Sequence, residues 1–359
     1  MKTVPSEPER RGAQVRDRLS AWFGERLHAD DVEIDDLVHH ADGFSWQTYT
    51  LTARWRNESG AKIVQGYAVR REPEDGVLAP YDIRAQYALH QQLVGRAGLP
   101  VPAVFWMELD PSILGMPFYA MERIEGTVPS PMERQPFAGD GPAAIGAQFV
   151  AILAALHAID WRALDLADSI ASSTDDPVTA AMAEVDRWEH FYESSTIREV
   201  PAIRAAMAWA RNNIATSDRL VLCHGDYRTG NFLLRDGAIV GVLDWELAHV
   251  GDPVEDLAWA ALPAFRGRST LVGHMLSERD FLESYRRHTG LEVSDDAFRF
   301  WTVISHVKAA SIFLRGARAF EDGRSNDLRL AMLGHRSTQL LADLLATLPR
   351  PHPKGRWNR

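Results

Sequence analysis

The chain has 359 residues, of which 46% are hydrophobic and 25% are charged, and its formal net charge is −10. This composition is ordinary for a globular protein of one large or two modest domains. The acidic balance argues against a nucleic-acid or anionic-membrane surface, because both partners attract basic patches.

Cysteine usage and hydropathy point to a reducing compartment. The single cysteine, Cys223, excludes an intrachain disulfide. No apolar run reaches about eighteen residues, so no membrane-spanning helix is expected. The first residues are polar and lack the apolar core of a secretory signal. We therefore expect a cytoplasmic protein.

The first third of the chain predicts a helix, a strand-rich region and a second helix. Apolar residues recur at helical spacing over residues 9–27. The later elements are read from β-rich runs, turn residues and a second amphipathic stretch. They are strands at Tyr49–Trp55, Val64–Arg71 and Phe118–Arg123, a turn at Asp42–Ser45, a strand beginning near Leu99, and a helix over 80–96.

A proline-rich segment at 129–142 predicts the crossing into a second, mainly helical domain. Ser277 and Asp280 form a helix N-cap signature, and Gly290 supplies the matching helix end. Further helices are expected at 145–159, 182–192, 201–213, 296–320 and 325–348.

The most informative stretch runs from Arg219 to Trp259. It contains a short apolar strand, the triplet His-Gly-Asp ending at Asp226, and two further apolar runs separated by Asp236-Gly237. That dipeptide is a strong hairpin signal, because glycine accepts the positive φ of a tight turn. Asn231 precedes the hairpin and Asp244 follows it. Single Asp or Asn residues usually mark turns, but this ordered set is far more specific.

These three residues bring oxygen-bearing side chains to one hairpin. Carboxylate and amide oxygens are the ligands that Mg²⁺ prefers, and proteins commonly share Mg²⁺ with substrate phosphates. Protein kinases use the same order of a catalytic Asp, an Asn five residues later, and a metal-binding Asp after a hairpin.

The segments HGDYRTGN and GVLDWELAHVGDPVEDLAW resemble the aminoglycoside phosphotransferase/choline kinase family. The sequence of these motifs is similar to that of bacterial phosphotransferase-family proteins and of kinase-like domains fused to acyl-CoA dehydrogenases. The resemblance is most specific over these forty or so residues and extends more weakly over nearly the whole chain. It implies an α+β, bilobal, protein-kinase-like fold. Residues 1–124 would form a nucleotide-binding lobe with an antiparallel sheet, and 125–359 a helical catalytic lobe.

The resemblance also implies nucleotide contacts in the first lobe. Gly43 and Ser45 would belong to a lid over the phosphates, and Glu122 with Ile124 to a hinge whose backbone faces adenine. Arg70 occupies the position of the kinase lysine that grips the phosphates, a role that a bidentate guanidinium can fill.

One departure from the kinase pattern is Gln86, which stands where kinases carry the glutamate that orients the lysine. We predict that Gln86 accepts one guanidinium N–H from Arg70, and that Arg70 reaches the phosphates.

In the second lobe, Asp226 would take the proton of the acceptor hydroxyl, and Arg228 would stabilise the transferring phosphoryl group. Asn231 and Asp244 would hold Mg²⁺. The implied reaction transfers phosphate from ATP, or another nucleoside triphosphate, to a small hydroxylated molecule.

Two other readings stay open from the sequence. Arg70 with Gln86 also suits an ATP-binding pseudoenzyme or scaffold, and the HGD and DWE segments also suit a two-metal hydrolase. The helical wall interleaves acids with Trp188 and Phe191, so an aminoglycoside is not assumed as the acceptor. Both a monomer and a homodimer are compatible with the chain.

Overall fold

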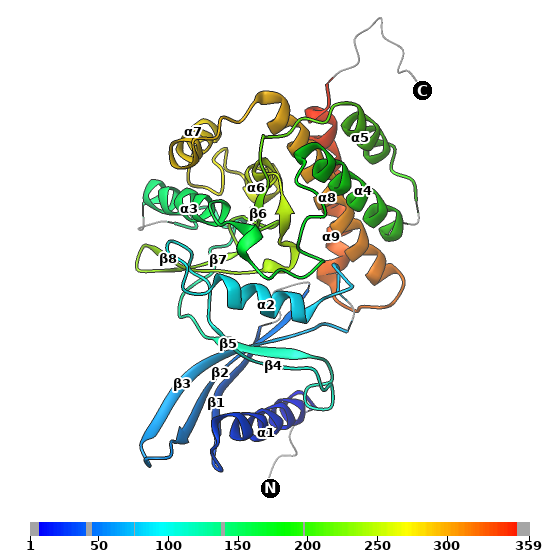
Figure 1. The fold of residues 1–359 in the computed structure, drawn as a ribbon. Coiled ribbons are helices and arrows are strands. Elements are labelled where there is room, and N and C mark those ends of the chain that lie inside the picture. The colour runs from blue at the N-terminus through cyan, green and yellow to red at the C-terminus, as the bar shows by residue number, and fades with distance from the viewer. Residues whose placement is uncertain (1–6, 41–44, 75, 138–140, 197, 350–359) are drawn as a thin grey trace, which may run out of the picture. The chain divides into compact units, whose positions relative to one another are not determined.

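The computed structural model describes residues 7–349 apart from 41–44, 75, 138–140 and 197. The chain folds into two compact units (Figure 1). The first comprises Met1–Val94 and Val101–Glu125, and the second comprises Gly95–Pro100 and Gly126–Arg359.

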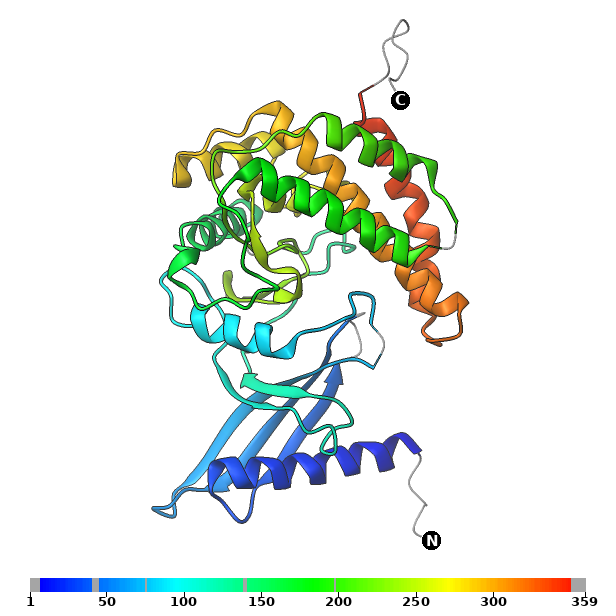
Figure 2. The same cartoon turned by 45° about the vertical axis from the view of Figure 1, so that its right-hand side comes forward.

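The first unit consists of an antiparallel sheet and two helices. Its elements are α1 (Glu7–Leu27), β1 (Glu33–His40), β2 (Gln47–Arg56), β3 (Lys62–Arg71), α2 (Ile83–Leu93), β4 (Val104–Glu108) and β5 (Phe118–Glu122). The five strands lie in the order β1-β2-β3-β5-β4. Helix α1 packs on one face of the sheet and α2 on the other (Figure 2).

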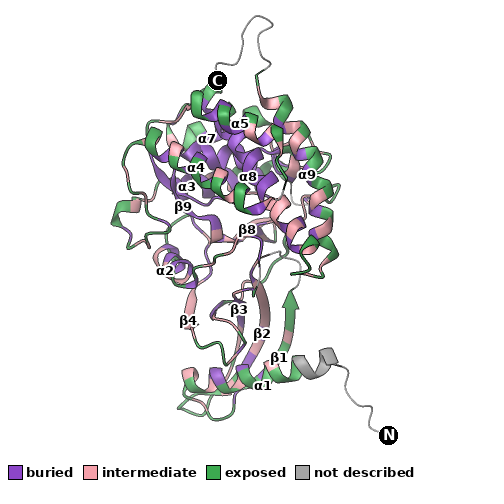
Figure 3. Cartoon of the chain, turned by 90° about the vertical axis from the view of Figure 1, so that its right-hand side faces the viewer, coloured by how far each residue is buried: buried purple, intermediate pink, exposed green. Residues whose placement is uncertain are grey.

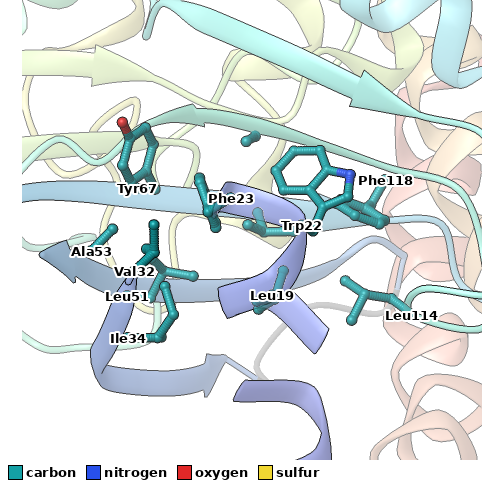
Figure 4. Packing of buried hydrophobic residues seen from close by; sticks show 12 residues of the cluster. Leu19, Trp22, Phe23, Val32, Ile34, Leu51, Ala53, Tyr67, Leu114 and Phe118 are labelled. Atoms are coloured by element: carbon teal, nitrogen blue, oxygen red, sulfur yellow. The ribbon is translucent and has the colours of Figure 1, made fainter. Parts of the chain in front are cut away.

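Strand alternation decides which side chains meet each helix. Tyr67 of β3 joins Trp22 and Phe23 of α1 in one core (Figure 4). Ala68 instead joins the cluster of Ile83 on the α2 side. Because side chains alternate along a strand, Arg70 belongs to the same face as Ala68. The period of two therefore turns Arg70 toward the α2 face.

The predicted strands and helices of this unit are present, and two of them begin later than predicted. Of the predicted turn at Asp42–Ser45, only Ser45 lies within the described residues. Helix α2 begins at Ile83 rather than residue 80, because Asp82 caps it by accepting from Ala85 N at 3.0 Å. The strand expected near Leu99 begins at Val104, since Pro100 and Pro102 carry no N–H for a sheet.

The second unit is larger and mainly helical. Its longer elements are α3 (Pro142–His157), α4 (Pro177–Ser195), α5 (Pro201–Asn212), α6 (Pro253–Ala260), α7 (Glu278–Thr289), α8 (Asp295–Glu321) and α9 (Leu328–Thr347). Its short elements are η1 (Trp161–Ala163), β6 (Val221–Cys223), β7 (Phe232–Arg235), β8 (Ala238–Val242), η2 (Trp245–Leu247), β9 (His249–Gly251) and η3 (Pro263–Phe265).

Helix α8 is the centre of this unit. It packs against α4, α5, α6 and α9, and its buried ribbon lies among them (Figure 3). The predicted helix caps are confirmed for α7: Ser277 Oγ accepts from Asp280 N, and Gly290 adopts φ 72° at the helix end. Within the part of the chain that is described, no helix combines the length and apolar character needed to cross a membrane.

Candidate active site

A tight hairpin sets the geometry of the candidate site. Asp236 and Gly237 have φ of 51° and 74°, the positive values that a type I′ turn needs. Strands β7 and β8 pair in antiparallel fashion on either side of this turn. At the open end of the hairpin, Leu243 N donates to Asn231 O at 2.8 Å. Asn231 and Asp244 are therefore neighbours, as the spacing predicted.

Three side chains hold the carboxylate of Asp226. Arg228 Nε donates to Oδ1 at 2.8 Å, and Trp259 Nε1 donates to the same oxygen at 2.6 Å. Asn231 Nδ2 donates to Oδ2 at 2.6 Å and to the Asp226 carbonyl at 2.9 Å. Arg228 also lies over the Phe265 ring, with Cζ 4.9 Å from its centre. The carboxylate is thus oriented from several directions while part of it stays accessible.

The arrangement of Asn231 and Asp244 suits a divalent cation. Because Asn231 directs its amide nitrogen to Asp226, its oxygen is the end left for another partner. Asp244 adopts a left-handed backbone with φ 62° and does not cap the η2 turn that follows it. An amide oxygen beside a carboxylate is a fitting pair of ligands for Mg²⁺.

The backbone of the Asp226 loop is held from α6. Asp256 accepts hydrogen bonds from His224 N at 2.7 Å and Gly225 N at 2.8 Å. Gly225 has φ 78°, and a Cβ there would lie 2.2 Å from Leu247 O, so only glycine fits. Asp252 caps the start of α6 in a similar way, since it accepts from Val254 N at 2.8 Å.

His224 acts as a neutral brace rather than a charged group. Its Nδ1 accepts from Asp226 N at 3.1 Å, and its Nε2 donates to Leu243 O at 2.9 Å. Burial lowers the pKa of His224, which favours the neutral ring. The histidine therefore joins the Asp226 loop to the end of β8.

Of the residues proposed to contact the nucleotide phosphates, the structure describes Arg70, Gln86 and Ser45. Arg70 is 6% exposed, with its guanidinium 5.7 Å from the centre of the Trp46 ring. Gln86 is buried in α2, and Ser45 lies in a bend just before β2. Gly43 lies outside the described residues. The Arg70–Gln86 hydrogen bond stays a prediction.

The two residues predicted to form the hinge lie at the end of β5. Glu122 N donates to Ala103 O at 2.7 Å, and Ile124 follows the strand. Arg71, the residue after Arg70, is bonded to other groups: its Nε donates to Leu114 O at 2.7 Å and its Nη2 to Glu74 at 3.1 Å.

The sequence model of the phosphotransferase enzyme family matches residues 36–291. The chain belongs to this family. Among curated proteins, this chain is 28% identical over 266 residues to acyl-CoA dehydrogenase family member 11 of Gallus gallus. This match covers 69% of the chain and 33% of the relative. The Rattus norvegicus counterpart is 27% identical over 314 residues, covering 79% and 38%. The chain thus spans well under half the length of these relatives.

Solved structures share the fold. A Ralstonia eutropha protein assigned as an aminoglycoside phosphotransferase superposes with a TM-score of 0.69 at 23% identity, covering 92% of this chain and 97% of that one. A thermostable mutant of aminoglycoside phosphotransferase APH(4)-Ia, solved with AMP-PNP and hygromycin B, gives 0.58 at 15% identity, covering 92% and 98%. The predicted kinase-like fold class is therefore confirmed.

A buried charge network in this phosphotransferase-family chain lies behind the Asp226 loop, and the sequence analysis missed it. Lys308 of α8 donates to Gly225 O at 2.6 Å and to Glu255 at 3.1 Å. His249 Nε2 lies 3.0 Å from the other oxygen of Glu255 and 3.5 Å from Glu184. All four side chains are buried. Fixed charges thus support the backbone that carries Asp226.

The sequence contains signals for Trp259 and Lys308, the two site residues that the sequence analysis missed. Trp259 lies three residues after Asp256 on α6, so both can face the same loop. Lys308 is the one charged residue within the apolar run from Val303 to Leu314. A lysine in such a run indicates a buried cation with a fixed partner.

The groups that resemble metal sites in this network are already bonded among themselves. Glu184, His249 and Glu255 gather their ligand atoms within 4.8 Å, as do His157, Cys223 and Asp256. In the second group, His157 lies 3.1 Å from Asp256 and 2.7 Å from the Tyr285 hydroxyl. Burial raises the pKa of the Cys223 thiol, which favours its neutral form.

The network predicts a pH-dependent stability. Burial alone would lower the pKa of His249, but Glu255 and Glu184 outweigh it and raise the pKa to about 9. A raised pKa stabilises the folded state fully below the unfolded value of about 6.5, and the stabilisation is lost as pH rises toward about 9. We expect the free energy of unfolding to fall between pH about 6.5 and 8, by at most ~1.4 kcal/mol per pH unit.

Urea unfolding at several pH values checks this expectation. The window ends below the range in which an unfolded cysteine ionises, so Cys223 adds little to the slope. The matched control is His249→Gln, which should be less stable overall and should lack this fall in stability over the same window. Equal slopes for the two proteins would contradict the assignment to His249.

Proposed function

We propose that the protein transfers the γ-phosphate of Mg²⁺-ATP to a hydroxyl group of a small molecule. The observation that carries the proposal is the Asp226 carboxylate. It is oriented by Arg228, Asn231 and Trp259, and its loop is fixed through Asp256. Phosphoryl transfer to an alcohol requires a fixed proton acceptor beside a positive charge, because most of the catalysis comes from positioning. Asp226 and the Arg228 guanidinium match these two requirements.

Asp226 orients the acceptor hydroxyl and takes its proton during transfer. Arg228 keeps one nitrogen on Asp226 and carries a positive charge next to the base. That charge opposes the negative charge on the transferring phosphoryl group, and removing one such contact commonly costs about 10²–10³ in rate. His224 and Asp256 act through the backbone and do not touch the reacting atoms.

Asn231 and Asp244 would hold Mg²⁺, which when bound neutralises charge on the phosphates. In the first unit, we propose that Arg70 contacts the phosphates with help from Gln86, Gly43 and Ser45. The backbone at Glu122 and Ile124 would receive the adenine. Residues 1–124 would then serve the nucleotide and 125–359 the acceptor. The APH(4)-Ia relative, solved with AMP-PNP, supports nucleotide binding.

The acceptor is proposed as a small hydroxylated molecule. Hygromycin B in the APH(4)-Ia structure supports a hydroxylated acceptor of modest size. The curated relatives, named as acyl-CoA dehydrogenase family members, support a different group, the hydroxyacyl thioesters. A screen should therefore contain sugars, amino alcohols, antibiotics and hydroxyacyl thioesters.

The test is nucleotide consumption with such an acceptor set, using ATP and GTP in parallel and with or without Mg²⁺. We expect one acceptor class to stimulate ADP or GDP release in a Mg²⁺-dependent manner. Nucleotide binding without any stimulated turnover would favour the scaffold instead. Phosphoester hydrolysis without nucleotide would favour the hydrolase.

A further inference from the structure

The second unit contains a cavity of about 580 Å³ that the proposed reaction does not use. It is lined by residues of α6, α7, α8, α9 and η3. Its lining includes none of Asp226, Arg228, Asn231 and Asp244. Its volume falls in the range of small-molecule sites, roughly 300–1,000 Å³.

One wall of the cavity carries a buried acceptor. His306 is 2% exposed, and its Nδ1 lies 2.8 Å from Thr302 O. A carbonyl only accepts, so Nδ1 carries the proton and Nε2 keeps a lone pair. Burial lowers the pKa of His306, which favours this neutral ring. Nε2 makes no hydrogen bond to any residue that the structure describes. The lone pair of His306 Nε2 is therefore available to accept a hydrogen bond from a ligand.

Acidic groups share the cavity with this acceptor. Asp343 lies close enough to His306 for its charge to act on the ring, and its carboxylate accepts a hydrogen bond from Gln339 Nε2 at 2.8 Å. Glu278 and Asp295 also line the cavity, at the starts of α7 and α8. At those positions their charges already complement the helix dipoles. Asp343 has no such compensation, because it lies in the last two turns of α9.

The two arginines of the cavity already have protein partners. Arg266 Nη1 donates to Thr270 O at 3.2 Å, and its Nη2 donates to Ala261 O and lies 3.4 Å from Glu278. Arg299 lines the cavity, and its guanidinium lies 3.5 Å from Asp296, a residue that does not line it. Arg266 Nε, in contrast, is buried without a hydrogen bond to a described residue. It is a donor that would match an oxygen of a ligand.

We propose that this cavity binds a small protonated amino alcohol. Its ammonium group would donate to the Asp343 carboxylate and to His306 Nε2, both of which are acceptors. Its hydroxyl oxygen would accept from Arg266 Nε. A plain alcohol would leave the Asp343 charge unmatched, and a plain diamine would leave Arg266 without an acceptor.

The test is isothermal titration calorimetry with three compounds that share one carbon skeleton. These are 1,3-diamino-2-propanol, 1,3-diaminopropane and glycerol. We expect the affinity to fall in that order, with no detectable glycerol binding at millimolar concentration. The titrations contain no nucleotide, so their outcome does not depend on phosphoryl transfer. Equal binding of the diamine and the amino alcohol would overturn the role of Arg266.

Variants locate the binding in the cavity. Asp343→Asn should weaken diamino-propanol binding about tenfold or more, since a hydrogen bond to a charged group is lost. His306→Leu should also weaken it. Glu321→Gln is the matched control: it changes the charge equally at the other, exposed end of α8 and should leave the affinity unchanged.

Two results would overturn the proposal. One is the absence of binding by the wild-type protein. The other is an equal loss for Asp343→Asn and Glu321→Gln, which would indicate general attraction to an acidic protein. Because Asp343 is only partly buried, its variant should fold, and a thermal melt near that of wild type verifies this.

Discussion

Asp226→Asn is expected to lower phosphoryl transfer by about 10²–10⁴ while nucleotide affinity stays nearly unchanged. An amide cannot take the acceptor proton, so the loss falls on turnover. The amide also cannot accept equally from Arg228, Asn231 and Trp259, whose donors converge on the carboxylate. The measurement is kcat for the acceptor found in the screen, with the nucleotide Kd determined separately.

Asp236→Asn is the matched control for this variant. Asp236 lies at the exposed hairpin turn with φ 51°, a conformation that asparagine also tolerates. It should retain wild-type turnover and stability. If Asp226→Asn turned over as fast as this control, Asp226 would not be the base. A large loss of nucleotide affinity would instead indicate a collapsed loop.

Local signals made the hairpin predictable. The Asp236-Gly237 turn is set by the backbone preferences of two adjacent residues, and the strand pairing follows from it. Asn231 and Asp244 are then brought together by the closing of the hairpin alone. The cap of α7 by Ser277 is predictable for the same reason, since its partner is three residues away.

Contacts between distant segments were not predictable from local pattern. The Trp259 bond to Asp226 joins residues 33 apart in sequence, and the Lys308 bond to Gly225 joins residues 83 apart. Neither spacing carries a periodic signal. The position of Arg70 shows an intermediate case: alternation along β3 assigns its face, but not its partners.

Asp256 and Lys308 show how the fold connects its core to the candidate site. Asp256 accepts from the backbone N–H groups of the Asp226 loop, and Lys308 donates to a carbonyl of that loop. Buried charges that are fully bonded hold a loop in one conformation more tightly than apolar packing does. These buried groups would supply the rigidity that the proposed phosphoryl transfer needs.

Lys308→Met should therefore be strongly destabilising. Lys308 is 1% exposed and donates a hydrogen bond to Glu255. Burial alone would raise the pKa of Glu255, but the positive charges of His249 and Lys308 outweigh the effect of burial and lower this pKa. Removing one partner of a buried ion pair leaves the other charge uncompensated, at a cost of about 3–5 kcal/mol. Chemical denaturation of the variant and of wild type measures the loss. The matched control is Lys62→Met, at the exposed start of β3, with an expected change within about 0.5 kcal/mol.

A double-mutant cycle separates the ion pair from packing at Lys308. Glu255→Gln alone should also destabilise, because the charges of Lys308 and His249 lose their partner. If the charges interact, the double variant Lys308→Met with Glu255→Gln loses less than the two single losses combined, by roughly 0.5–3 kcal/mol. Strict additivity would mean that Lys308 acts only through the Gly225 carbonyl and its contacts with the rings of Trp188 and Trp259. In that case Lys308→Met would still lower kcat through the Asp226 loop, whereas Glu255→Gln would lower it much less.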